Sequence, residues 1–133
     1  MEISIINPEN MVKPRGYSHA VSVSGAHKTI YIGGQDAIDE AGRLVGPNDL
    51  MEQTRQALAN IEKVLEKAGA KLGDVIKLGI HIKQGRNPLE GFQAFQAKWG
   101  DNPRFPAITV LFVAELGRPD WLVEIDAVAV VPE

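Results

Sequence analysis

Two carboxylates stand two residues apart in the segment LVEIDAVAV, which covers residues 122–130. Strict alternation along a β-strand would put Glu124 and Asp126 on one side and leave only apolar side chains on the other. Paired acids suggest general acid–base chemistry, although side chains two apart on a strand lie about 7 Å apart. Because a buried acid is costly unless it is paired, the acidic side is solvated, an interface or a site.

Other polar residues are weaker candidates for chemistry. The three histidines, His19, His27 and His81, lie on different predicted elements without HxH or HExxH spacing, so no metal site is expected. His81 fits a structural or interface role better than a catalytic one. Asp126 fits a salt bridge with Lys77 or with a neighbouring subunit. No P-loop, GxGxxG or GxSxG motif occurs, and no cofactor is predicted.

Tyr17 is the residue that packing explains least well. It follows Pro14-Arg15-Gly16, and the glycine and proline predict a bent loop that presents Tyr17 just before a strand. Loops placed by rigid strands are where sites concentrate. A ligand contact and a buried anchor are equally compatible with this pattern.

The elements that position these residues follow from periodicity and capping signals. Strands are predicted at 19–24, 29–33, 75–83, 107–116 and 121–131, and helices at 50–68 and 88–99. Asn48 or Asp49 can cap the first helix, and Asn87 can cap the second. The second helix is expected to bury a stripe made of Leu89, Phe92, Phe95 and Trp99. The order β-β-α-β-α-β-β predicts a two-layer α+β fold with a mixed sheet and both helices on one face.

Composition predicts one domain over residues 1–133 and excludes several classes of protein. The absence of cysteine excludes disulfides and thiolate chemistry, and it fits a cytoplasmic protein. No apolar run approaches the roughly 20 residues of a membrane span, and the acidic N-terminus is not expected to be a secretory signal. A net charge of −3 without any basic run disfavours a nucleic-acid partner.

Two helices can cover only one face of the predicted sheet. The strand at 75–83 would place Val75, Lys77 and His81 on the other face, together with the two acids and with apolar residues of the last strand (Leu122, Val128 and Val130). A face that is half polar and half apolar usually marks an oligomer interface, so self-association is predicted.

Three stretches resemble the RidA/YjgF family of reactive-intermediate (enamine/imine) deaminases. They are Gly16-Tyr17-Ser18-His19-Ala20-Val21, Ile30-Tyr31-Ile32-Gly33-Gly34-Gln35, and Pro106-Ala107-Ile108-Thr109-Val110 followed by Val123-Glu124-Ile125-Asp126-Ala127. The helix with Gln53-Thr54 and Asn60-Ile61, ending at Ala68-Gly69, also fits the family pattern. The resemblance covers nearly the whole chain and keeps the order of the elements.

The resemblance implies a chorismate-mutase-like α+β fold and a homotrimer with sites in the clefts between subunits. It also implies that a small metabolite binds there. By this likeness Glu124 positions or activates the attacking water as the catalytic residue, and Tyr17 closes the cleft. Gly33, Ile108 and Thr109 occupy motif positions that line the substrate site.

Two positions depart from the family pattern. An Arg that follows Pro-Ala clamps the substrate carboxylate in the family's deaminases, and Ile108 stands in its place here. The usual Ser-Gly-Gln strand end is Gly-Gly-Gln, so Gly33 lacks a hydroxyl. Hydrogen bonds to charged groups contribute roughly 1.5–3 kcal/mol, and Ile108 cannot make such a bond to a carboxylate. Simple 2-imino acids are therefore expected to be poor substrates. Arg104 and Arg118 flank the strand and could substitute.

Two classes of function therefore remain open at the level of sequence. The first is a hydrolytic deaminase for a changed enamine or imine. The second is a trimer that binds a small metabolite without chemistry, as a sensor or accessory factor. A ribonuclease is a weaker third reading, because the acidic balance does not suit RNA.

Overall fold

The computed structural model describes all 133 residues and contains six strands, two α-helices and one short 3₁₀ turn. Their bounds are β1 Glu2–Ile6, β2 Ala20–Ser24, β3 His27–Gln35, α1 Leu50–Lys67, η1 Leu72–Asp74, β4 Val75–Lys83, α2 Pro88–Trp99, β5 Ala107–Val113 and β6 Val123–Pro132. Both predicted helices and all five predicted strands are present, with shifted ends. The short strand β1 was not predicted.

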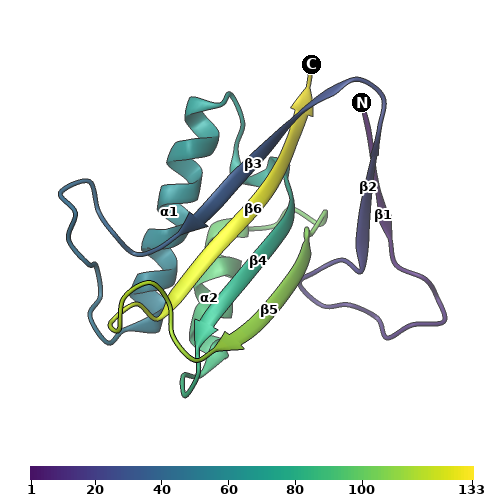
Figure 1. Cartoon of the computed structure of the whole chain (residues 1–133). Coiled ribbons are helices and arrows are strands. Elements are labelled where there is room, and N and C mark those ends of the chain that lie inside the picture. Colours follow the sequence, from purple (N-terminus) through teal and green to yellow (C-terminus); the bar gives the residue numbers. More distant parts are fainter.

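Four strands form a mixed sheet in the order β3-β6-β4-β5. β4 and β5 run parallel and are joined through α2, whereas β6 pairs antiparallel with β3 and with β4. Both helices lie behind this sheet in Figure 1, and its other face is left open. The predicted α+β fold with two helices on one face of a mixed sheet is therefore confirmed.

The first two strands form a separate antiparallel pair, which runs from Glu2 opposite Ser24 to Ile6 opposite Ala20. Figure 1 shows this hairpin standing beside β5, with the chain passing over the top of the sheet to reach β3. The consecutive strands β2 and β3 are thus joined but not paired. Ser18 anchors the base of the hairpin, because its Oγ donates to the Phe105 carbonyl at 2.6 Å.

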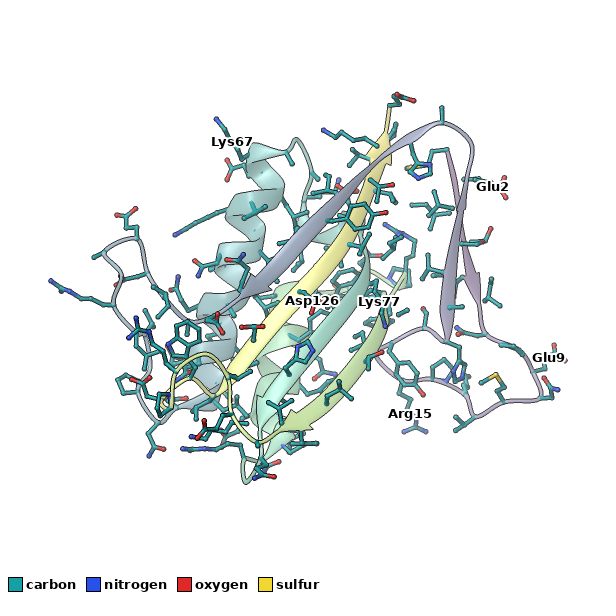
Figure 2. The ribbon with its side chains drawn as sticks, viewed as in Figure 1. Glu2, Glu9, Arg15, Lys67, Lys77 and Asp126 are labelled. Carbon is teal, nitrogen blue, oxygen red and sulfur yellow. The ribbon has the colours of Figure 1, made fainter.

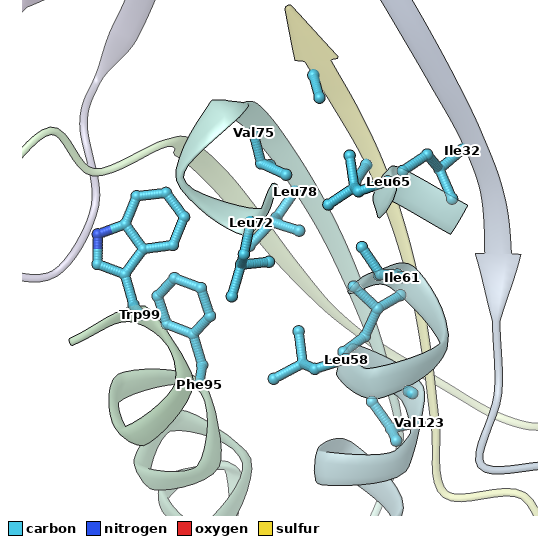
Figure 3. Packing of buried hydrophobic residues seen from close by; sticks show 14 of the residues in the cluster. Ile32, Leu58, Ile61, Leu65, Leu72, Val75, Leu78, Phe95, Trp99 and Val123 are labelled. Carbon is cyan, nitrogen blue, oxygen red and sulfur yellow. The ribbon is translucent and has the colours of Figure 1, made fainter. Parts of the chain in front are cut away.

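Helix α1 begins and ends as the sequence predicts. The Asp49 side chain accepts a hydrogen bond from the Glu52 N–H, which satisfies one of the free N–H groups at the start of the helix. Gly69, in the left-handed conformation at φ 80°, follows its last turn. The inner side of α1 packs on β6 and β3, and Figure 3 shows Leu58, Ile61 and Leu65 meeting Leu78 and Val123 of the sheet in the core.

Helix α2 corrects one prediction. Asn87 caps it and Pro88 opens it as expected, and Phe95 and Trp99 are buried in the core. Leu89 and Phe92, however, are 54% and 39% exposed rather than part of a buried stripe. The reason is that they face the edge strand β5, where the sheet ends and a hollow begins.

Positions near the ends of β4 and β6 also depart from strict alternation. Val75 was assigned to the open face, but it is fully buried because a bulge shifts the pairing between Val75 and Lys77. Leu122 and Val130 were placed beside the acids and are instead buried at 3% and 1% exposure. The alternation therefore holds from Val123 to Ala129, where every second residue is buried, and is lost after Ala129.

Candidate functional site

The acidic part of the candidate site lies where β3 bends beside β6. The pairing of these strands shifts register between Ile32 and Gln35, so that Gly33 and Gly34 together lie opposite a single residue of β6. A Cβ built at Gly34 would come within 2.6 Å of Glu124 Oε2. The missing side chain therefore lets the Glu124 carboxylate lie directly against the backbone of β3. Gly33 faces open space, with nothing within 4 Å of such a Cβ.

A second acid completes this corner of the molecule. Asp36 follows β3 directly, and its burial, the charge of Glu124 and a hydrogen bond with Glu124 raise the pKa of Asp36 from 3.8 to about 7. The Asp36 Oδ1 atom is buried without a hydrogen-bond partner. Near neutral pH these two carboxyl groups can therefore hold one proton between them.

Helix α1 fixes the segment that carries Asp36. The Asn60 side-chain amide donates to the carbonyl oxygens of Asp36 and Ile38, at 3.0 and 2.8 Å. Asn60 itself accepts a hydrogen bond from Gln56, one turn earlier on α1. The acid at residue 36 thus sits on a loop that a helix holds in place, and not on a free loop tip.

Lys77 and Asp126, which were considered as a salt bridge, contact other residues of the open face instead. Lys77 does not pair with Asp126, because its Nζ donates to Thr109 Oγ1 at 2.7 Å. Asp126 instead approaches His81, with Oδ2 3.8 Å from Nδ1. The same ring nitrogen lies 3.2 Å from the backbone oxygen of Glu124. His81 thus bridges the two acidic positions of β6, and Figure 2 shows Lys77 and Asp126 on the face away from the helices.

A cavity of about 570 Å³ lies on the helix side of the molecule, at the edge formed by β5. Its walls come from β4, β5, β6, both helices and the loop that carries Tyr17. Apolar lining residues include Ile80, Ile108, Val110, Phe112, Leu89 and Phe92. Tyr17, Thr54 and Asn87 are the polar side chains of the lining. Leu89, Phe92, Val110 and Phe112, which are exposed apolar side chains of α2 and β5, are therefore walls of one hollow.

The structure divides the predicted site residues between two faces. Ile108 pairs with Leu78 of β4 and therefore points to the helix side, where it lines the cavity with Tyr17. Thr109 and Glu124 share the open face, but two strand spacings, about 10 Å, separate their strands. Within one chain Glu124 meets Gly34 of β3 and Asp36, and it does not meet Ile108 or Tyr17.

Sequence reasoning missed Asp36 and most of the cavity. Asp36 was not among the candidate residues, and its contact with Glu124 depends on a bulge that has no signal in one sequence. Val110 and Phe112 alternate with Thr109 and Leu111 on β5, which is compatible with either a covered or an open strand face. Only the position of β5 at the edge of the sheet shows that this face opens into a hollow.

No group of three or more His, Cys, Asp or Glu side chains is arranged to hold a metal ion. Neither helix is long and apolar enough to cross a membrane.

The fold agrees with comparisons to known proteins. A family model described as Endoribonuclease L-PSP matches residues 9–131. A RutC family protein of Pyrococcus horikoshii is 35% identical over 94% of this chain and 95% of its own length. A relative from Dermatophagoides farinae named 2-iminobutanoate/2-iminopropanoate deaminase is 30% identical over 86% of this chain and 85% of its own.

Solved structures give the same result. YyfB of Yersinia pestis, described as a protein of unknown function of the conserved Rid family, has a TM-score of 0.84 and 37% identity, and the match covers 98% of this chain and 100% of that one. RidA from a Psychrobacter species has a TM-score of 0.70 and 28% identity, over 96% and 98% of the two chains. The chain belongs to the Rid/YjgF family.

Proposed function

We propose that this protein is a hydrolytic deaminase of small enamines or imines, with sites in the clefts between the subunits of a homotrimer. The observation that carries the proposal is the separation of the site residues onto two faces of one chain. A cavity with Tyr17 and Ile108 lies on one face, and the acids Glu124 and Asp36 lie on the other. A second copy that places its acids over the cavity of the first would complete one site.

The acid pair supplies both proton transfers that imine hydrolysis requires. The Glu124 carboxylate takes a proton from water as the water oxygen adds to the C=N carbon, and protonated Asp36 donates to the imine nitrogen. The resulting amino alcohol then re-forms a C=O bond as its C–N bond breaks. Asp36 takes the hydroxyl proton, Glu124 returns its proton to nitrogen, and ammonia leaves. The pair ends in its starting protonation state.

A binding-only trimer is the second candidate. The observation that favours it is Ile108, which puts an apolar side chain at the position of the family's carboxylate clamp. Ribonuclease activity has less support, because none of the side chains lining the cavity is a lysine or an arginine that could contact a phosphate.

The test of catalysis compares two acid-to-amide variants of the same strand. Imines are generated in place from amines or amino acids by an oxidase, and ammonia release is followed above the spontaneous rate. Glu124→Gln is expected to lower the catalysed rate by about a hundredfold or more. Asp126→Asn, two residues further on β6, is expected to keep most of it. Equal rates for wild type and Glu124→Gln on every imine, with ligand still bound, would leave the binding-only trimer as the function.

A further inference from the structure

The lining of the cavity carries information about the substrate that the acid pair does not. None of its side chains carries a charge at neutral pH, since tyrosine is its only ionisable residue. Phe92 and Phe112 are 39% and 53% exposed in the chain, so large apolar surfaces face the hollow. A volume of about 570 Å³ is within the range of small-molecule sites, roughly 300–1,000 Å³.

The basic side chains near β5 contact groups outside the cavity or point away from it. Arg104 donates through Nη2 to the Gly73 carbonyl, and the Arg118 guanidinium lies 6.0 Å from the centre of the Trp121 ring. Lys77 is on the opposite face of the sheet, bound to Thr109. Arg15 precedes the lining residue Gly16, and Figure 2 shows its side chain pointing outward from the loop. Neither Arg104 nor Arg118 therefore replaces the missing clamp in this conformation.

We propose that the cavity binds an aromatic or branched aliphatic group of an imine or enamine that has no carboxylate. The inference rests on the proposed function, which supplies the reacting C=N group, and it adds the class of substrate. A carboxylate placed against Ile108 would lose its hydration without gaining a partner. A phenyl or branched alkyl group would instead cover the exposed parts of Phe92, Val110 and Phe112, which are 39–53% exposed in the chain.

The chemistry of such a substrate fixes the kind of reaction that supplies it. A 2-imino acid arises by oxidation or elimination from an amino acid and keeps the carboxylate. An imine without a carboxylate arises when a primary amine loses two electrons and two protons to oxygen or to an oxidised cofactor. Hydrolysis then converts the imine and water into an aldehyde or ketone and ammonia. The proposed reaction therefore follows an amine-oxidising step.

The first test is a binding comparison between phenylacetamide and phenylacetate, which share a shape and differ in charge. Calorimetric titration of the wild type should give a Kd for phenylacetamide at least tenfold below that for phenylacetate. Ile108→Arg should reverse the order. Phe112→Ala should weaken phenylacetamide binding with little change in melting temperature, because this side chain is half exposed on an edge strand. Arg15→Gln should leave the preference unchanged.

Three results would overturn the inference. Phenylacetate could bind as tightly as phenylacetamide, which would mean that a cation outside the lining reaches the cavity; loss of that binding in Arg15→Gln would identify it. A second contradicting result is that neither probe binds at millimolar concentration. Finally, apolar side chains of a second copy could fill the cavity, and the assembled protein would then exclude both probes.

A turnover comparison separates this inference from the proposed function. An amine oxidase acting on phenethylamine yields an aldimine, and an amino acid oxidase acting on phenylalanine yields the corresponding 2-imino acid with the same ring. Faster ammonia release from the aldimine, dependent on Glu124, supports both proposals. Preference for the 2-imino acid would overturn the inference and leave deamination intact. Selective phenylacetamide binding without turnover of either imine would overturn catalysis and leave the ligand class intact.

Discussion

At the scale of single residues, the raised pKa of Asp36 predicts how the stability of the protein depends on pH. The pKa of Asp36 is raised from 3.8 to about 7 by burial and by Glu124. Between these two values the native state holds a proton that the unfolded chain releases. The free energy of unfolding therefore falls as pH rises through this window, and the loss is complete above about pH 7.

Asp36→Asn is expected to remove this pH dependence. The amide carries no charge, and its N–H can donate to Glu124 at every pH. At pH 8 the variant should be more stable than wild type by on the order of 1 kcal/mol, a modest value because Asp36 is only partly buried. Thermal unfolding should then show a melting temperature about 3–5 °C higher at pH 8, and little difference at pH 4.

A neighbouring acid provides the control for this measurement. Asp39 accepts hydrogen bonds from the N–H groups of Ala41 and Arg43, and an asparagine there keeps an oxygen for them. Asp39→Asn should keep the wild-type slope of stability against pH. The contradicting outcome is a wild-type free energy of unfolding that rises between pH 4 and pH 7 in parallel with that of Asp36→Asn. It would show that the acid pair does not share a proton.

At the scale of elements, one buried polar side chain of α1 ties two loops to the core. Gln53 is 0% exposed, and its amide donates to the carbonyl oxygens of Gly46 and Asp120 at 3.2 and 3.1 Å. Its Oε1 accepts from the Leu122 N–H at 2.8 Å. The side chain therefore sets where α1 begins relative to the start of β6, the strand that carries Glu124.

Gln53→Leu keeps the approximate volume of the side chain but leaves the Asp120 carbonyl and the Leu122 N–H without partners, whereas the Gly46 carbonyl still accepts from the Asp49 N–H. Each unsatisfied buried group costs about 1–3 kcal/mol, so the variant should lose about 2 kcal/mol or more of unfolding free energy. Urea denaturation would measure the loss. Arg55→Leu, on the exposed side of the same turn, should change the value by less than about 0.5 kcal/mol. Similar values for both variants would mean that Gln53 has no special structural role.

The sequence predicts those features that depend on local patterns. Helix α1 is specified by its apolar spacing, by Asp49 at its start and by Gly69 after its end, and all three agree with the structure. Gln53 was not expected to be buried, because a polar side chain satisfied by distant backbone groups leaves no local signal. Phe92 was assigned to the core because periodicity shows which side of a helix is apolar, but not whether another element covers it.

The candidate site was predicted as a list of residues but not as an arrangement. Glu124 and Tyr17 were indicated by local patterns as well as by resemblance to the family. Gly33, Ile108 and Thr109 followed from the resemblance alone, which carries no information on which face each occupies. Their separation comes from register, since Ile108 and Thr109 are neighbours on β5 and point to opposite sides of the sheet. Register between strands depends on long-range packing and on bulges, and a single sequence does not define either.

At the scale of the whole molecule, the open face of the sheet is too apolar for water. Tyr31 is 80% exposed and Leu111 is 50% exposed, and both share this face with Val128. Sedimentation of the wild type is expected to give three times the 14.5 kDa chain mass. Leu111→Lys should give monomers, because a lysine would be buried at the interface without a partner. Val64→Lys, at an exposed apolar position on α1, should remain a trimer.

Because the two halves of the proposed site lie on different faces, subunits with different defects should repair one another. Glu124→Gln leaves the cavity intact, and Val110→Trp fills the cavity while leaving the acids intact. Each variant alone should be inactive. When the two are unfolded together and refolded as an equal mixture, random assembly in a cyclic trimer pairs an intact cavity with an intact acid half in about a quarter of the clefts. Ammonia release should recover to about that fraction of the wild-type rate. Failure to recover, in mixtures shown by mass spectrometry to contain both chains, would place the whole site within one subunit.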